Sequence, residues 1–428
     1  MKILVLTDDA WNDDVHGNNF PSNWFEGFPA EFANIYLRPE KPYNNCCEKY
    51  FQITDNMMFK SIFNGKPAGE AFEVSDMKSV SKTTDYPQKN LYIFLKRIAG
   101  DLFRLLRELI WFVGRVDKKA LEAFINEFNP DIIFSPRFIS NKVLRMEKII
   151  FEIAKKPIVA FTGDEEYSLK FLELSPLFWV KKFAERKALR KMMPNYSLYY
   201  TLSQTQLEDY KKLFNCNIKI VRKSGDFSEF SSDKAKNDPI KIVYAGKLYM
   251  KRWKTLAEIA KALEVINKNE IKMTLDIYTR DILTKKQLKL LNDGKNVFLK
   301  EPVTQGELKE VYKNADIALH VESFSMKVRT ILRVAFSTKI IDLFDSGCAI
   351  IAIAPSINSG IAYLKKEDSA ICIEDKSSIL NAFKNIADNS KIIDIYRRKG
   401  FECGKKNHLR SVVQKEMYED FKKISGAE

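Results

Sequence analysis

The sequence predicts an α/β protein of two consecutive doubly wound domains, a class in which helices cover both faces of a parallel sheet. Short apolar runs rich in β-branched residues alternate with segments of helical periodicity along the chain. A length of 428 residues suits two or three domains, and a composition of 45% hydrophobic and 29% charged residues is typical of globular proteins. One polar stretch near the middle interrupts the alternation and marks the domain boundary.

The N-terminal domain is expected to span residues 1–225. Helices fill most of the gaps between its apolar runs. The expected strands are Lys2–Leu6, Ala33–Leu37, Asp131–Phe134, Pro157–Phe161, Ser197–Leu202 and Ile218–Val221. Residues 226–239 then lose periodicity and are rich in Ser, Asp and Lys, as linkers are.

The C-terminal domain is expected to span residues 240–390. It begins with Ile240–Gly246, a strand that ends in glycine, and a helix from Trp253 to Ile266 follows. Its further expected strands are Met273–Tyr278, Val297–Leu299, Asp316–Val321, Ala349–Ile353 and Ala370–Ile373. The tail of residues 391–428 is predicted to be mostly helical, with breaks near Gly400 and Gly404, and to pack back across the domain boundary.

Composition narrows the setting of the protein. The six cysteines lack C-x-x-C spacing and indicate neither a disulfide framework nor a zinc site. The first apolar run is too short for a signal peptide, and charged residues interrupt every run before the ~18 residues of a membrane span. We therefore expect a cytoplasmic protein. The formal charge of +14 favours a phosphorylated substrate, an anionic membrane or nucleic acid as a partner.

Residues 336–352 form the most informative segment. Their pattern indicates a loop, a short helix capped by Ser337, a helix-ending Gly347 and a strand. The hydroxyls of Ser337 and Thr338, the free backbone N–H groups and Lys339 can together hold a diphosphate. The alternative is a plain capped helix whose charged side chains are solvated.

Asp342 follows Thr338 by four residues, on the same helical face, where its carboxylate can accept hydrogen bonds from ribose hydroxyls. The segment resembles the donor-site motif of retaining glycosyltransferases of family 4, in the branch that assembles bacterial polysaccharides. In that pattern a ribose-binding glutamate stands five residues before the helix-ending glycine, and Asp342 holds this position. The pattern's other glutamate falls on Val334, and Ser337, Thr338 and Lys339 match a variant in which hydroxyl and lysine groups face the donor phosphates.

The resemblance extends over nearly the whole chain at the level of architecture. It implies the GT-B fold, in which an N-terminal Rossmann-like domain binds the acceptor and a C-terminal one binds the nucleotide sugar. It also implies a glycosyltransferase of surface polysaccharide synthesis, of capsule or O-antigen type, that works with retention at the inner face of the plasma membrane. A UDP-sugar is the favoured donor, and a glycan or lipid-linked saccharide is the implied acceptor.

Residues 244–254 are similar to the strand, glycine and basic loop that open the donor domain in that family. Gly246 lets the backbone approach a phosphate closely. Lys247, Arg252 and Lys254 can neutralise the phosphate charge. A solvated basic turn is the alternative.

The loop after the first strand is the third segment of resemblance. Family members place a glycine-containing loop here, against the donor phosphate and the acceptor, and Gly17 and Asn18 are the matching residues. His16 can polarise a hydroxyl group, although a lone histidine is more often structural.

The implied mechanism needs no protein nucleophile, because the leaving phosphate assists deprotonation of the acceptor. Positive charge on that phosphate then carries much of the catalysis, which makes Lys339 and Arg252 the expected catalytic residues. Asp164, at a strand end, is the third expected catalytic residue and is expected to contact the sugar or the acceptor, with helix capping as the alternative. Glu322 is expected to bind sugar hydroxyls, with a structural strand-end acid as the alternative. Neither a metal nor a cofactor beyond the nucleotide sugar is expected.

Two basic amphipathic segments, residues 95–112 and 181–191, lie in the N-terminal half. Each is either a core-facing helix with a solvated back or a surface for anionic lipid. The apolar stripe of the first comprises Leu102, Leu105, Leu106, Leu109 and Ile110.

The leading hypothesis is therefore a nucleotide-sugar glycosyltransferase. A sugar-nucleotide epimerase of the same fold and a catalytically silent sugar-binding homologue are the alternatives. Nucleic-acid binding is a remote third, because the chain has no zinc finger or aromatic-rich RNA-binding motif and its charge is not clustered in one tail.

Overall fold

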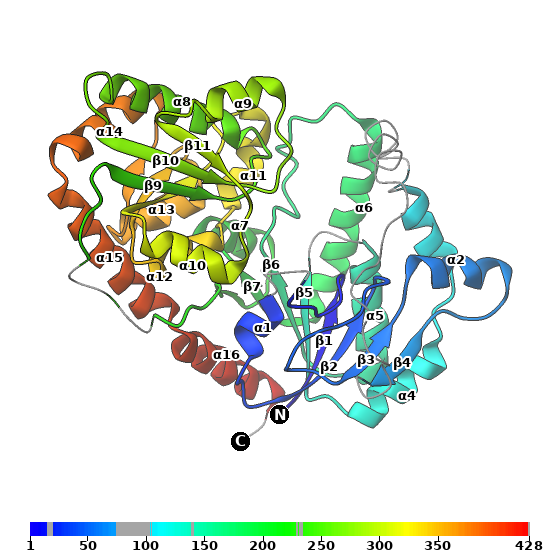
Figure 1. Cartoon of the computed structure of the whole chain (residues 1–428). Helices are drawn as coiled ribbons and strands as arrows, with labels where there is room; N and C mark the ends of the chain where they lie inside the picture. The colour runs from blue at the N-terminus through cyan, green and yellow to red at the C-terminus, as the bar shows by residue number, and fades with distance from the viewer. Residues whose placement is uncertain are drawn as a thin grey trace.

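The computed structural model describes residues 1–14, 20–73, 103, 105–137, 141–227, 230 and 234–426. It consists of two α/β lobes, each built around one mainly parallel sheet (Figure 1). This confirms the fold class that the sequence predicts. No helix among the described residues is both long enough and apolar enough to span a bilayer.

Within the described residues, the N-terminal sheet has eight strands in the order β4-β3-β2-β1-β5-β6-β7-β8. Only β4 runs antiparallel to its neighbour. The strands are β1 (Lys2–Thr7), β2 (Glu31–Tyr36), β3 (Lys49–Gln52), β4 (Glu70–Glu73), β5 (Ile132–Arg137), β6 (Ile158–Thr162), β7 (Tyr196–Thr201) and β8 (Ile218–Ile220). The helices are α1 (Phe20–Phe25), α2 (Asp55–Phe63), α4 (Lys118–Phe128), α5 (Asn141–Ala154), α6 (Pro176–Met192) and α7 (Gln204–Leu213), together with a helix at 105–113 and the short η2 (Met193–Asn195).

The C-terminal sheet has six parallel strands in the order β11-β10-β9-β12-β13-β14, again counted over the described part of the chain. They are β9 (Ile240–Ala245), β10 (Met273–Tyr278), β11 (Val297–Lys300), β12 (Ile317–Val321), β13 (Ala349–Ile353) and β14 (Ile371–Ile373). The helices are α8 (Arg252–Ile266), α9 (Lys285–Leu291), α10 (Gln305–Lys313), α11 (Arg329–Val334), α12 (Lys339–Asp345), α13 (Ser359–Lys366) and α14 (Ile379–Asp388), with short helices η3 (Met326–Val328) and η4 (Lys376–Ser378).

The C-terminal tail returns to the N-terminal domain, as the sequence predicts. Helix α15 (Lys391–His408) runs along the C-terminal lobe, and α16 (Arg410–Ser425) lies beside α1 of the other lobe (Figure 1). The hydroxyl of Tyr200 donates a 2.7 Å hydrogen bond to Asp420 of α16, and the Phe421 ring packs near Phe25 and Phe134. A continuous buried apolar cluster therefore joins the tail to both domains.

The predicted helix breaks at Gly400 and Gly404 are wrong. Helix α15 runs through both glycines, and the helical tail is interrupted at Leu409 instead. A Cβ atom on Gly400 would lie 3.3 Å from the Ser369 carbonyl oxygen, and one on Gly404 would lie 2.8 Å from Cβ of Phe344. The glycines allow close packing of the helix on its domain rather than ending it.

Candidate active site

Three segments of the C-terminal domain converge at the carboxyl edge of its sheet, where ligands of open parallel sheets bind. Arg252 is the first residue of α8, after β9, and Lys339 is the first residue of α12. Glu322 directly follows β12. The structure thus brings together two of the expected catalytic cations and one expected donor-binding carboxylate.

Arg252 and Glu322 form a bidentate ion pair. Nε and Nη2 of Arg252 donate to the two carboxylate oxygens of Glu322 over 2.9 and 2.7 Å. The side chains are 17% and 4% exposed, and the Tyr249 ring lies 4.9 Å from the guanidinium. Burial disfavours the charged guanidinium, but the carboxylate outweighs burial and raises the pKa of Arg252. Glu322 therefore holds Arg252 in place.

Lys339 is enclosed at the end of β9. Its ammonium donates to the carbonyl oxygen of Ala245 and lies 5.1 Å from the Tyr244 ring centroid. Burial and, to a smaller extent, the charge of Arg252 lower the pKa of Lys339 to about 8. A Cβ atom on Gly246 would collide with the Lys339 ammonium, so this glycine makes room for the cation.

Asp342, three residues after Lys339 in α12, pairs with a lysine from another part of the chain. Nζ of Lys223 lies 2.5 Å from Oδ1 of Asp342. Lys223 belongs to the segment that leaves β8 and leads to the C-terminal domain, and its side chain is 10% exposed, against 41% for Asp342.

His320 lies within β12, behind the ion pairs. The imidazole is buried, and burial, followed by the charges of Arg252 and Lys339, lowers its pKa to about 3. Its Nε2 atom has no hydrogen-bond partner among the described residues. The ring is uncharged at neutral pH and contributes no positive charge to the cluster.

The predicted cap of α12 is wrong. The helix begins at Lys339, and its N-cap position, Thr338, makes no side-chain capping bond. The backbone carbonyls of Ser337 and Thr338 instead accept from the next turn, as in a tight 3₁₀ turn. Gly347 follows the helix with a φ of +69°, which suits its predicted role as the terminator.

The basic loop between β9 and α8 divides into an inner and an outer part. Arg252 points inward, whereas Lys247 and Lys254 are exposed, and Lys254 lies 5.6 Å from the Trp253 ring centroid. A pocket of about 440 Å³ opens beside this loop, lined mainly by Leu248, Tyr249, Lys251, Trp253, Asp281 and Gln287. The structure does not bring Lys247 or Lys254 into the inner cluster.

Asp164 lies on the opposite, N-terminal side, in the loop after β6. The side chain has access to solvent, yet the surrounding protein and the neighbouring Glu166 raise the pKa of its carboxyl group. Its backbone carbonyl accepts a 2.7 Å hydrogen bond from Nε2 of Gln206 in α7. That bond anchors the loop to the N-terminal domain.

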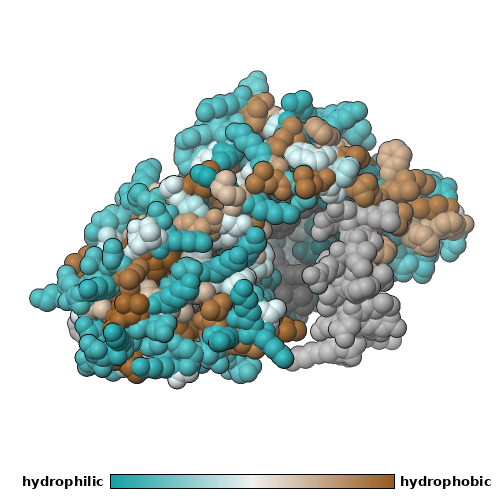
Figure 2. All heavy atoms as spheres, turned by 90° about the horizontal axis from the view of Figure 1, so that it is seen from above, coloured by the Kyte–Doolittle hydropathy of each residue, from teal (hydrophilic) through white to brown (hydrophobic). Residues whose placement is uncertain are grey.

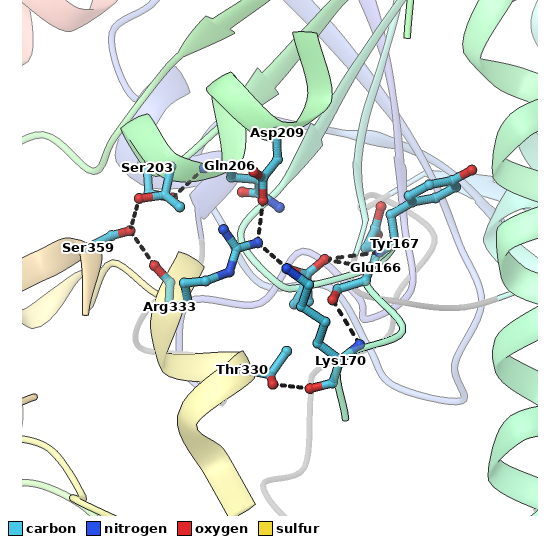
Figure 3. A network of polar contacts seen from close by, with 12 residues as sticks. Glu166, Tyr167, Lys170, Ser203, Gln206, Asp209, Thr330, Arg333 and Ser359 are labelled. Carbon is cyan, nitrogen blue, oxygen red and sulfur yellow. Dashed lines mark hydrogen bonds and ion pairs between the residues drawn. The ribbon is translucent and has the colours of Figure 1, made fainter. Parts of the chain in front are cut away.

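A polar network joins this loop to the C-terminal domain (Figure 3). Arg333 of α11 donates to both Glu165 and Asp209, and Thr330 donates to the Lys170 carbonyl oxygen. Ser359 adds a 2.5 Å bond to the Arg333 carbonyl and contacts Thr205 of α7 at 2.9 Å. The two domains therefore meet directly beside Asp164.

A second cluster of charged side chains lies at the carboxyl end of β1, in the N-terminal domain. Nζ of Lys142, only 2% exposed, lies 2.5 Å from Asp8, and Nε of Arg38 lies 2.8 Å from Asp9. The predicted loop residues His16, Gly17 and Asn18 lie outside the described residues.

Lys223 and Arg333 are functional candidates that the sequence did not indicate. Lys223 is 119 positions from its partner, and Arg333 is 168 positions from Glu165, so no local spacing relates them. For Lys223, the only signal in the sequence was that it forms a basic pair with Arg222 just before the linker.

No protein-family model matches the sequence, and the curated proteins contain no match either. Solved structures do match along the full length. Sucrose-phosphate synthase of Thermosynechococcus elongatus is 10% identical, with a TM-score of 0.63 and 100% of both chains covered. Anabaena HepE in complex with UDP is 12% identical, with a TM-score of 0.61, covering 99% of this chain and 100% of that one.

TarM of S. aureus, in complex with fondaparinux, α-GlcNAc-glycerol and UDP, is 10% identical, with a TM-score of 0.59 over 98% of this chain and 99% of that one. The chain has the GT-B fold. At this level of identity the likeness establishes the arrangement of the two Rossmann-like domains and not the chemistry between them.

Proposed function

We propose that the chain is a glycosyltransferase that binds a nucleoside diphosphate sugar between its domains and transfers the sugar to a saccharide or lipid-linked acceptor with retention. The role we propose is surface polysaccharide synthesis, of capsule or O-antigen type, at the cytoplasmic face of the membrane. UDP is the favoured nucleotide, since two of the similar structures hold UDP.

The observation that carries the proposal is the surplus of positive charge at the C-terminal strand ends. Arg252 pairs with Glu322, whereas Lys339 donates to a backbone carbonyl and has no ion pair among the described residues, so its positive charge is uncompensated. A buried charge without a partner destabilises the fold unless an anion binds next to it. A diphosphate supplies that anion, and the exposed Lys247 and Lys254 then attract it from outside.

The proposed reaction uses that charge on the leaving group. The bond from the anomeric carbon to the diphosphate oxygen breaks while the acceptor oxygen bonds to the same carbon, and the acceptor proton passes to the diphosphate. Lys339 and Arg252 stabilise the negative charge that develops on the diphosphate, and the groups of this chain need neither accept nor donate that proton. We propose that the reaction needs no metal ion, because the two cations take this role.

Other residues are assigned by their position. We propose that Asp342, Ser337 and Thr338 bind the ribose and the phosphates, and that Glu322 acts on the donor through Arg252. Asp164 stands on the acceptor side, where we propose that its exposed carboxyl group hydrogen-bonds to sugar hydroxyls.

Membrane contact is proposed for the N-terminal lobe. Figure 2 shows apolar side chains gathered at the end of the molecule where this lobe lies. Leu109 and Phe112 of the helix at 105–113 are 55% and 80% exposed, and Val180 and Phe183 of α6 are 60% and 57% exposed. The rest of the predicted first segment, residues 95–102 and 104, lies outside the described residues. Helix α6 also carries Arg190 and Lys191 in its last turn, and apolar and basic residues together suit anionic lipid.

Two of the three histidines, His320 and His408, give the epimerase alternative no support, and His16 lies outside the described residues. Acid–base chemistry near neutral pH needs groups that titrate there, but the pKa values of His320 and His408 are both lowered to about 3 by burial. Neither ring is poised to exchange protons with a sugar.

The test is a thermal-shift panel of UDP, GDP, CDP and ADP and their common sugar conjugates, with and without EDTA. A ligand that binds only the folded chain raises the Tm. We expect a shift with one nucleotide family, unchanged by EDTA, and slow hydrolysis of its sugar conjugate. Absence of any shift would contradict the proposal, and a shift without hydrolysis or transfer would identify a silent homologue.

A further inference from the structure

The segment that leaves the N-terminal sheet presents a single lysine to the donor motif. Nζ of Lys223 lies 2.5 Å from Oδ1 of Asp342, and no other hydrogen bond or ion pair of either side chain occurs among the described residues. The lysine is almost enclosed, whereas Asp342 remains partly open to solvent. Asp342 thus keeps an accessible side on which a ligand can bind.

The backbone around Lys223 is fixed on both sides. Nε of Arg222 donates to the Leu202 carbonyl over 2.9 Å, and its guanidinium lies 4.5 Å from the ring centroids of both Phe336 and Tyr363. The amide of Ser224 donates to Oδ1 of Asn23 over 2.7 Å. Because its neighbours are held in this way, Lys223 is aimed at α12 rather than mobile at the surface.

The charges explain why a lysine is needed at this position. Lys339 and Asp342 are three residues apart in α12, so their side chains are neighbours on the helix. An anion bound by Lys339 therefore comes close to the Asp342 carboxylate, which repels it. Lys223 offsets this repulsion, since its ammonium neutralises the carboxylate without covering its exposed side.

We propose that Lys223 is a positioning residue of the donor site. It cancels the charge of the Asp342 carboxylate, so that one site can hold both a hydroxyl-binding carboxylate and a diphosphate. The inference rests on the proposed function and adds to it a residue from outside the donor domain.

The test compares UDP with uridine, which has the same ribose and no phosphate. Affinities are measured by calorimetry at low ionic strength for the wild type, Lys223→Met, Lys223→Arg and the double variant Lys223→Met/Asp342→Asn. If UDP does not raise the Tm in the thermal-shift panel but GDP does, GDP and guanosine are used in place of UDP and uridine. Lys219→Met, which removes a lysine paired with Asp420 of the tail, is the matched control.

We expect Lys223→Met to weaken UDP binding about 10-fold and uridine binding no more than about 2-fold, since the unpaired carboxylate repels only the charged ligand. Lys223→Arg should retain UDP binding. The double variant should regain most of the loss, because removing the carboxylate charge removes the repulsion, and Lys219→Met should bind as the wild type does.

Equal losses for UDP and uridine, or no rescue in the double variant, would show that Lys223 is merely structural and overturn the inference. Normal UDP binding by a folded Lys223→Met chain would overturn it too, while leaving the proposed function intact. A wild-type chain that binds no nucleoside diphosphate would overturn both, so the two failures can be told apart.

Discussion

The ends of β1 and of β9 and β12 are both clusters of charged side chains at the carboxyl edge of a parallel sheet, but their charges balance differently. At β1, Asp8 and Asp9 pair with Lys142 and Arg38, and Lys142 also lies 4.0 Å from Asp55, so this cluster has no surplus cation. At β9 and β12, Arg252 pairs with Glu322, whereas Lys339 has no ion pair among the described residues, so one positive charge remains. The carboxyl edge of the sheet therefore has no surplus cation in the N-terminal domain and one surplus cation in the C-terminal domain.

This difference fits the proposed function, which assigns the donor to the C-terminal edge and the acceptor to the N-terminal edge. An edge without a surplus cation suits a saccharide acceptor, which is recognised by hydrogen bonds, whereas a positive edge suits a diphosphate. The comparison therefore predicts that charge removed from the C-terminal edge affects nucleotide binding, and that charge removed from the N-terminal edge affects stability alone.

Arg252→Met should have the largest effect. It leaves the buried Glu322 carboxylate unpaired, and breaking a buried pair by losing one partner costs about 3 kcal/mol of unfolding free energy. Nucleotide affinity should also fall, by about 10- to 100-fold for one lost charge-assisted contact. Chemical denaturation and calorimetry measure the two effects.

The double variant Arg252→Met/Glu322→Gln separates the two effects. It should recover most of the stability, because no uncompensated charge remains, but none of the nucleotide affinity. Recovery of both would mean that Arg252 does not contact the nucleotide.

Lys142→Met probes the N-terminal edge. Asp8 loses the cation that lies 2.5 Å away but keeps Arg38 at 3.4 Å, so the unfolding free energy should fall by about 2 kcal/mol. Nucleotide affinity, measured below the unfolding transition, should stay within about 2-fold of the wild type. A folded variant with lost nucleotide binding and unchanged stability would reverse the assignment of the two edges.

The pH dependence of binding should be the smaller effect. The pKa of Lys339 is lowered from its ordinary 10.5 to about 8, so the charged form that binds phosphate is lost as pH rises above 8. Nucleotide affinity should therefore fall between pH 8 and 10, by at most 10-fold per pH unit. The unfolding free energy should instead rise with pH. The buried charge of Lys339 destabilises the fold fully below pH 8, and this effect disappears toward pH 10.5.

Lys339→Arg is the control for that titration. A guanidinium stays charged throughout this range, so the variant should show a flat affinity profile. A fall of equal steepness in the wild type and the variant would assign the titration to another group.

Most of the fold was predictable because the central strands are continuous apolar runs. The runs at β10 and β13 match their strands residue for residue, since β13 is buried along its whole length and β10 along most of it. Strands β3 and β4 were missed. Each has four residues, and β4, with the sequence EAFE, is an exposed edge strand without an apolar run.

The candidate site was predictable only where it is local in sequence. Arg252 follows β9 and Lys339 begins the helix that precedes β13, so both side chains could be assigned to the edge. The pairing of Arg252 with Glu322 joins residues 70 positions apart, and that of Lys223 with Asp342 joins residues 119 apart, and neither leaves a periodic trace. Long-range ion pairs are fixed by packing, which a single sequence does not display.

The central claim is that the surplus cation at the C-terminal edge holds a nucleoside diphosphate. The most direct measurement is calorimetric titration of UDP into the wild type and Lys339→Met at pH 7.5. The account predicts binding by the wild type, and about 10- to 100-fold weaker binding by a variant that unfolds at the wild-type temperature or above, because a buried charge has been removed. Equal affinity in the two proteins would contradict it.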